Sequence, residues 1–84
     1  MTTDINSDLV LHLLLEHEII EPSPDLSADS DLFALGLDSM ALMQLMLQIE
    51  ASFGVAIDPS EVRREHFATA TALTAFLQHK TLSR

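Results

Sequence analysis

The sequence contains no cysteine, and this absence excludes several kinds of chemistry at once. Without a thiol the chain can form no disulfide, bind no metal through thiolates and supply no cysteine nucleophile. Glycine and proline are also scarce, with 2 and 3 occurrences in 84 residues, and no stretch shows a strand, a turn and a second strand in succession. A β-rich fold is therefore not indicated.

Basic side chains are few. Lys and Arg together number 4 against 13 carboxylates, which gives a formal net charge of −9. A protein that binds nucleic acid needs cations to neutralise phosphates, so direct nucleic-acid binding is excluded. Twelve of the carboxylates lie in residues 1–62, where no Lys or Arg occurs. The negative electrostatic field of these carboxylates favours the approach of basic partner surfaces. Alternatively, the charge serves only to keep a small domain soluble.

Long apolar runs are missing as well. The longest, Leu9–Leu15, is interrupted by His12 and is far shorter than the roughly 20 residues that cross a bilayer. The first residues, Met1–Asp4, carry no positive side chain of the kind that begins a signal peptide. We therefore expect a cytoplasmic protein without membrane insertion. Its length and its 48% apolar content predict one compact domain over residues 1–84.

Helix-forming residues dominate, and the sequence predicts an all-α fold: a four-helix bundle of three longer helices and one short helix, with a long first loop. Pro22 and Pro24 prevent the first helix from continuing. Asp58 and Glu61 match a capping box at a helix start, and Thr69 matches an N-cap. The expected helices cover about residues 4–18, residues 39–53, a short segment from residue 58 and a segment after residue 69, with an apolar loop packed over the bundle at residues 21–38.

The second predicted helix, which begins at Ser39 and stops before Gly54, has two apolar faces. The face expected in the core has the spacing i, i+3, i+4, i+7 and i+11 and consists of Leu42, Leu45, Met46, Ile49 and Phe53. The second face consists of Met40, Met43 and Leu47. This second face either contacts a partner protein, for which flexible methionines are suited, or is covered by the preceding loop.

Ser39 stands at the start of this helix, directly after Asp38 and three residues after Gly36. The first N–H groups of a helix are unpaired and lie at the positive end of its dipole, so a phosphate on the Ser39 hydroxyl would be stabilised. Gly36 permits close approach of a bulky partner to the serine. Alternatively, Ser39 or Asp38 is simply the N-cap. A serine hydrolase is not indicated, because its nucleophile sits on a strand–turn–helix elbow, which this segment lacks.

Two groupings of side chains invite comparison with metal sites. Acidic and hydroxyl side chains alternate in the long loop, at Asp25, Ser27, Asp29 and Asp31. A calcium-binding EF-hand loop starting there would need Gly and Glu where the chain has Ser30 and Gly36. His12 and Glu16 are four residues apart and match an exposed pair on a helix face, because a zinc site needs three or four ligands.

The stretch DLFALGLDSM, residues 31–40, resembles the phosphopantetheine-attachment motif of acyl and peptidyl carrier proteins. The resemblance continues through the following helix to Val55. The length, the helix order and the acidic charge extend it to residues 4–82.

This resemblance implies that Ser39 carries a covalent 4′-phosphopantetheine arm, transferred from coenzyme A by a phosphopantetheinyl transferase. Asp38 would aid recognition by the transferase, and Gly36 would permit the loop geometry. The thiol of the arm would hold an acyl or aminoacyl group as a thioester, and the domain itself would catalyse no reaction.

Carriers of fatty-acid synthesis usually present carboxylates on the helix after the serine. Here only Glu50 remains, and the other corresponding positions are Ala41, Gln44 and Ala51. The resemblance therefore implies docking through Met40, Met43 and Leu47 rather than through ion pairs. Residues 44–47 and 63–67 look closer to D-alanyl carrier proteins and similar stand-alone amino-acid carriers, which an adenylate-forming ligase loads.

The partners that the resemblance implies are the transferase, an acyl- or aminoacyl-activating ligase of the adenylate-forming kind, and a downstream transferase or synthase, all acting on a monomer. Arg63 and Arg64 are candidates for contact with the phosphate of the arm, with an acidic rim of a partner or with acids of this domain. The alternative function is a small helical protein–protein interaction domain without a prosthetic group, using the same apolar face. A calcium-responsive module is a third.

Overall fold

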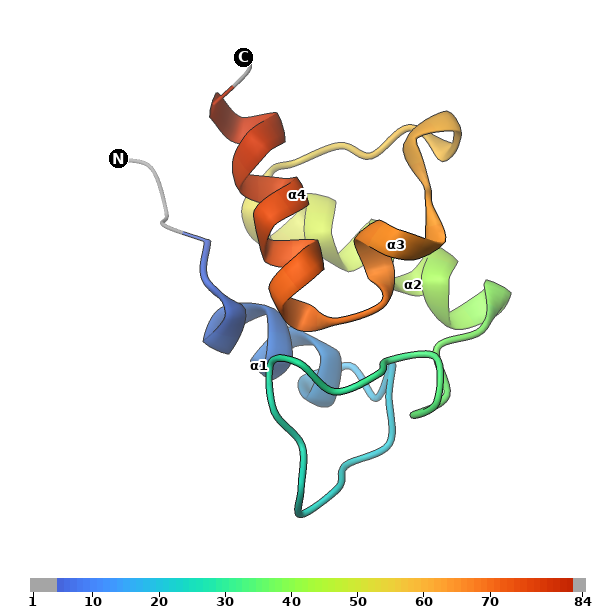
Figure 1. Cartoon of the computed structure of the whole chain (residues 1–84). Helices are drawn as coiled ribbons and strands as arrows, with labels where there is room; N and C mark the ends of the chain where they lie inside the picture. The colour runs from blue at the N-terminus through green and yellow to red at the C-terminus, as the bar shows by residue number, and fades with distance from the viewer. Residues whose placement is uncertain (1–4, 83–84) are drawn as a thin grey trace.

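The computed structural model describes residues 5–82, which contain four α-helices, one short 3₁₀ helix and no strand (Figure 1). The elements are α1 (Ser7–Glu16), α2 (Ser39–Phe53), η1 (Pro59–Glu61), α3 (Arg64–Phe67) and α4 (Ala70–Leu82). Helix α4 packs against α1 and against the short α3, and α2 runs behind them in the view of Figure 1. The predicted all-α fold with a long first loop is confirmed.

Each of the four α-helices and the long loop contribute to one core. Its most deeply buried large side chains are Val10, Leu14, Leu32, Leu45, Ile49, Phe67, Leu73 and Leu77. Leu45 and Ile49 belong to the face of α2 that the spacing placed inside, and the other members of that face are half-buried against the core. The prediction for the inner face of α2 is therefore confirmed.

The loop between α1 and α2 is held to the bundle through its backbone. The N–H of Leu32 donates to the carbonyl of Ala68 at 2.8 Å, and the N–H of Thr71 donates to the carbonyl of Ala28 at 3.0 Å. Leu32 itself is completely buried. The loop packs over the bundle, as predicted, and these contacts secure the chain that leads into α2.

The short third helix differs from the prediction, because two elements occupy its place. The predicted capping box of Asp58 and Glu61 is present, but it opens only the 3₁₀ helix η1. Val62 and Arg63 then take extended backbone conformations, and Val62 packs against the core. The half-buried Val62 thus separates η1 from α3, which begins at Arg64.

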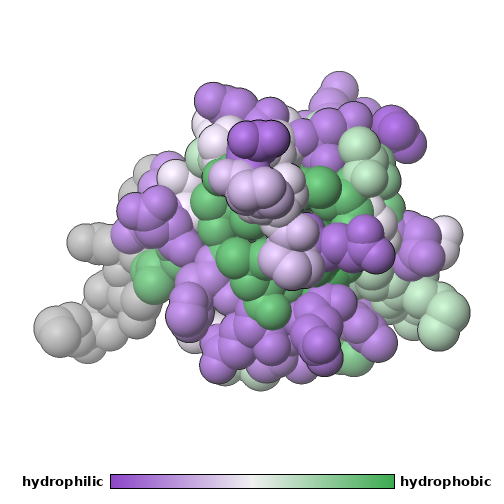
Figure 2. Space-filling view, turned by 90° about the horizontal axis from the view of Figure 1, so that it is seen from below, coloured by the Kyte–Doolittle hydropathy of each residue, from purple (hydrophilic) through white to green (hydrophobic). Residues whose placement is uncertain are grey.

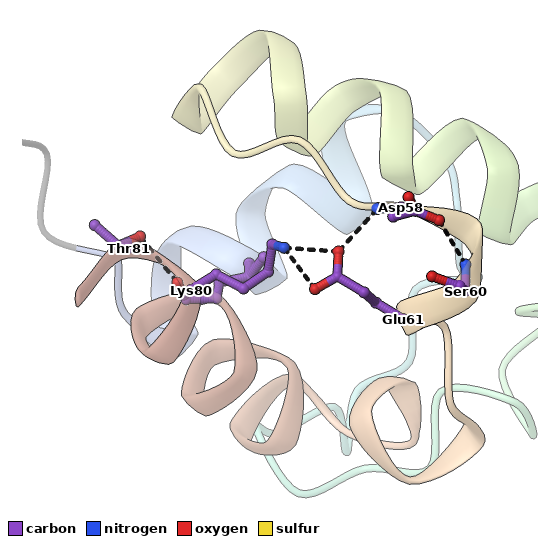
Figure 3. Close-up of polar contacts among 6 residues, drawn as sticks. Asp58, Ser60, Glu61, Lys80 and Thr81 are labelled. Atoms are coloured by element: carbon purple, nitrogen blue, oxygen red, sulfur yellow. Dashed lines mark hydrogen bonds and ion pairs between the residues drawn. The ribbon is translucent and has the colours of Figure 1, made fainter. Parts of the chain in front are cut away.

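Lys80 on α4 joins this region through Glu61 (Figure 3). Its Nζ atom donates to both carboxylate oxygens of Glu61 at 2.7 Å, and the same carboxylate accepts a hydrogen bond from the N–H of Asp58 at 3.0 Å. The hydrogen bond from Lys80 is the main cause that lowers the pKa of Glu61 below its ordinary value. The pKa of Asp58 is lowered as well, because its carboxylate accepts hydrogen bonds from Ser60.

The Glu61 carboxylate is expected to make stability depend on pH in acid. A carboxyl whose pKa is lower in the folded than in the unfolded protein stabilises the fold above the unfolded pKa, about 4.3 for Glu, and this contribution is lost as the pH falls through the folded pKa. Urea unfolding at about pH 7, 5 and 3.5 should show a decline that is smaller in Glu61→Gln, which keeps an acceptor but cannot titrate. Equal declines in both proteins would contradict this role.

Helix α1 ends at Glu16, two residues earlier than predicted, in a left-handed turn. The N–H of Ile19 bonds to the carbonyl of Leu14 at 2.9 Å, and Glu18 takes a φ of 55°. Glycine usually occupies this position at a helix end, because the left-handed conformation costs other residues about 1–2 kcal/mol. Glu18 is therefore held in a conformation that its side chain disfavours.

Glu18→Gly is expected to raise the free energy of unfolding by about 0.5–1 kcal/mol, because the relieved strain exceeds the larger unfolded-state entropy of glycine. For a domain of this size the thermal midpoint should rise by about 2–8 °C. His17→Gly is the matched control, since His17 has a φ of −95° and gains nothing from glycine. A lower midpoint for both variants would show that the strain at Glu18 is negligible.

Candidate functional site

Ser39 opens α2 with an exposed side chain. The capping role left open by the sequence belongs to Asp38, whose carboxylate accepts the N–H of Ala41 at 2.9 Å and whose backbone is extended. Within residues 5–82 the Ser39 hydroxyl therefore has no hydrogen bond to break before it can react. Asp38 therefore caps the helix, and the hydroxyl of its neighbour Ser39 stays available for modification.

The surroundings of the hydroxyl suit an esterified phosphate. Helix α2 has 15 residues, and the N-terminal end of such a helix carries partial positive charge that favours an anion. Gly36 has a φ of 110°, and a Cβ atom there would meet nothing within 4 Å, so the backbone conformation rather than crowding requires glycine. An exposed serine at the dipole's positive end, behind a permissive turn, fits the attachment of a phosphopantetheine group.

The second apolar face of α2 is exposed. Its members Met40, Met43 and Leu47 show 75%, 67% and 66% of their surface to solvent. The alternative in which the loop covers them is wrong, because they remain exposed and the loop is hydrogen-bonded to Ala68 and Thr71 instead. Three large apolar side chains on one helix face, with this much exposure, are typical of a surface that binds another protein.

Two grooves lie along α2. The first, which we call the acidic groove, has a volume of about 680 Å³ and is formed by the end of α1, residues 18–22, residues 35–36, and Asp38, Met40, Ala41 and Gln44. Its charged residues are all carboxylates, from Glu18, Glu21 and Asp38. The second, which we call the apolar groove, has a volume of about 460 Å³ between α2 and the residues Ile57, Pro59 and Val62, and Glu50 is its single charged residue. Spacing in the sequence did not indicate that Glu18 and Glu21 lie near Asp38.

Arg63 and Arg64 are both exposed, at the N-cap and at the first position of α3. The guanidinium of Arg64 lies 4.2 Å from the centre of the Phe33 ring, a cation–π contact that fastens α3 to the long loop. In the part of the chain that the structure describes, neither arginine forms an ion pair with a carboxylate. Within the domain Arg64 thus contacts the ring of Phe33. The sequence did not indicate this contact, because the two residues lie far apart in the chain.

The histidines are placed at the surface or against aromatic rings. His12 and Glu16 form the predicted exposed pair, with 3.5 Å between Nε2 and Oε2. His66 stacks on Phe76 with 4.6 Å between ring centres, and its Nδ1 atom is buried without a hydrogen-bond partner in the described structure. Neither His12 nor His66 lines the acidic groove beside Ser39.

The acids of the long loop shape the loop itself. Asp31 accepts the N–H of Phe33 at 3.0 Å, and Asp29 accepts the hydroxyl of Thr71 at 3.0 Å. Within residues 5–82 no three His, Asp or Glu side chains gather where they could hold a metal ion. Across the same residues, no helix combines the length and the apolar character that crossing a membrane requires.

Comparison with known proteins identifies what this site resembles. The family model described as "Phosphopantetheine attachment site" matches residues 14–77, which is more than half of the chain. A D-alanyl carrier protein of Lactococcus lactis subsp. cremoris is 43% identical over 54 residues, covering 63% of this chain and 68% of the relative. Aminoacyl carrier protein 2 of Bradyrhizobium diazoefficiens is 35% identical over 51 residues, covering 61% and 57%.

A solved structure has the same fold over nearly its whole length. It is a chain in the complex of an engineered Bradyrhizobium japonicum glycine:[carrier protein] ligase with a carrier protein from Agrobacterium tumefaciens and ATP. The TM-score is 0.72 at 28% sequence identity, and the match covers 87% of this chain and 96% of that one.

Proposed function

Since this chain belongs to the phosphopantetheine-attachment family of carrier proteins, we propose that it is a stand-alone carrier whose arm is attached to Ser39 and holds an acyl or, preferentially, an aminoacyl group. The observation that carries the proposal is the exposed Ser39 hydroxyl at the start of α2, with the capping role taken by Asp38. We further propose that one carrier domain spans residues 1–84 and acts as a cytoplasmic monomer.

The attachment is a phosphoryl transfer at the Ser39 hydroxyl. Its Oγ atom forms a bond to the β-phosphorus of coenzyme A, the bond to the bridging oxygen breaks, adenosine 3′,5′-bisphosphate leaves, and a base of the transferase takes the proton. The bound group supplies the thiol that a chain without cysteine lacks. Activation and release of the cargo belong to the enzymes that dock on the carrier.

Two features support an aminoacyl cargo and a ligase of the adenylate-forming kind as loading partner. The relatives that match are named D-alanyl and aminoacyl carrier proteins, and the structural neighbour occurs in a complex with a glycine:[carrier protein] ligase. The exposed face of Met40, Met43 and Leu47 offers such a partner an apolar contact without a carboxylate among the three. A downstream transferase or synthase would use the same face in turn.

Intact-mass measurement tests the attachment. The protein is incubated with coenzyme A, magnesium and a phosphopantetheinyl transferase of broad specificity, and the mass should increase by one phosphopantetheine. Ser39→Ala should show no increase, whereas Asp38→Asn should keep the helix cap and react more slowly, because the charge for transferase recognition is gone. A folded wild-type protein without an adduct would favour the interaction domain instead.

Loading of the arm tests the cargo. The modified protein is offered glycine or alanine with ATP and an adenylate-forming ligase, and in parallel malonyl or long acyl donors with their transferases. An aminoacyl thioester on the wild-type protein is the expected product. Malonyl or long acyl thioesters alone would contradict the aminoacyl assignment while leaving the attachment to Ser39 intact.

A further inference from the structure

The two grooves on α2 differ in charge. The acidic groove has apolar walls, from residues such as Leu15 and Ile20, and its charged residues are the carboxylates of Glu18, Glu21 and Asp38. The apolar groove carries Glu50 alone among apolar residues. A cavity that combines apolar walls with carboxylates alone complements a ligand that is apolar along its length and cationic at one end.

Two of these carboxylates are available to a ligand. Within residues 5–82 neither the Glu18 nor the Glu21 side chain takes part in a hydrogen bond or an ion pair. No Lys or Arg occurs before Arg63, and none lines the acidic groove. The negative charge of the groove is therefore not neutralised by the domain itself.

The acidic groove also lies beside the proposed attachment point. Asp38 and Met40, the two sequence neighbours of Ser39, line the acidic groove, whereas Leu42 and Met43, which follow Ser39 by one helical turn, line the apolar groove. Figure 2 views the molecule from below, where hydrophobic residues are exposed between hydrophilic ones. Both grooves therefore lie next to the attachment point, and their charge is what distinguishes them for a cationic cargo.

We propose that the acidic groove receives the loaded end of the arm when the cargo is an amino acid, with Glu18 and Glu21 contacting the free α-ammonium group. This inference rests on the proposed function and adds to it a recognition of the cargo by the carrier. An acyl cargo without an ammonium group would gain nothing from these carboxylates. The carrier would then hold aminoacyl and simple acyl groups differently.

The effect should be moderate and sensitive to salt. Both glutamates are exposed, so each contact with an ammonium is worth only a fraction of the energy of a buried ion pair. We expect Glu18→Gln with Glu21→Gln to lower the docked fraction about two- to fivefold. Raising the salt concentration should reduce docking in the wild-type protein in the same direction.

NMR of the ¹⁵N-labelled protein tests this proposal. The arm is attached and loaded through a stable amide with either glycyl or acetyl, which differ by the ammonium group, and intact mass first verifies a single loaded arm. The backbone amides of residues 18–22 should shift in the glycyl form relative to the acetyl form, and those of residues 57–62 should not. The Glu18→Gln, Glu21→Gln variant should lose most of the difference, and Glu50→Gln, the matched control in the apolar groove, should keep it.

Equal spectra for the glycyl and acetyl forms at residues 18–22 would overturn the proposal, as would shifts confined to residues 57–62. A difference that survives in the Glu18→Gln, Glu21→Gln variant would overturn the role of these two carboxylates. Failure to attach any arm to Ser39 would instead contradict the proposed function, and the mass measurement separates that result from the others.

Discussion

Phe67→Ala is expected to lower the free energy of unfolding by about 3–5 kcal/mol. Phe67 is completely buried at the end of α3, and its ring contacts that of Phe76 at 6.0 Å between centres. Removal of the ring leaves a cavity where α3 meets α4. A domain of 84 residues has a total stability of about 4–13 kcal/mol, so this loss removes from about a quarter to all of it.

Urea unfolding followed by circular dichroism measures this effect. Leu47→Ala is the control, because it removes an apolar side chain that is 66% exposed and should change stability by about 0.5 kcal/mol or less. A loss below about 1 kcal/mol for Phe67→Ala would mean that the ring is not at the centre of the core.

Met43→Glu combined with Leu47→Glu is expected to reduce kcat/KM for loading by an adenylate-forming ligase about thirtyfold or more. Burial of two such side chains against a partner contributes about 2–3 kcal/mol, and the variant replaces them with charges that the partner would have to desolvate. The folded protein should hardly be affected, because both side chains are mostly exposed. Steady-state loading of the modified carrier, with its thermal midpoint measured alongside, tests the prediction.

Ala51→Glu combined with Ser52→Glu provides a matched control for charge. Both residues are exposed on α2 outside the apolar face, and the variant adds the same two negative charges to the same helix. Loading should then remain within a few-fold of wild type. If both double variants slow loading equally, net charge rather than the apolar face governs docking.

Much of the fold follows from patterns local in the sequence. The boundaries of α2, the helix stop at Gly54, the capping box at Asp58 and Glu61 and the cap at Thr69 are all present as predicted. Each depends on hydrogen bonds between residues no more than four positions apart or on backbone conformations that few residue types adopt. The inner face of α2 was equally predictable, because apolar periodicity marks the stripe that a helix buries.

The sequence was less informative about which residue at the candidate site caps α2 and which is free to be modified. Both Asp38 and Ser39 are good capping residues, so the sequence alone could not decide between them. The structure assigns the cap to Asp38, which accepts the N–H of Ala41, and this assignment leaves the Ser39 hydroxyl exposed. The split of the short helix was missed because the extended backbone at Val62 accompanies packing of this half-buried side chain against the core, which local sequence patterns do not report.

The sequence by itself determined that the chain is helical, that it is acidic without thiols, and that a serine follows an aspartate where a helix begins, since composition and short-range hydrogen bonding set these properties. Only the tertiary structure decided that Met40, Met43 and Leu47 face solvent and that Glu18 and Glu21 join Asp38 around one groove. The contact of Arg64 with Phe33 was likewise decided only by the tertiary structure. The physical reason is that exposure and cavities arise where segments distant in the chain meet, and their meeting is governed by packing of the whole core.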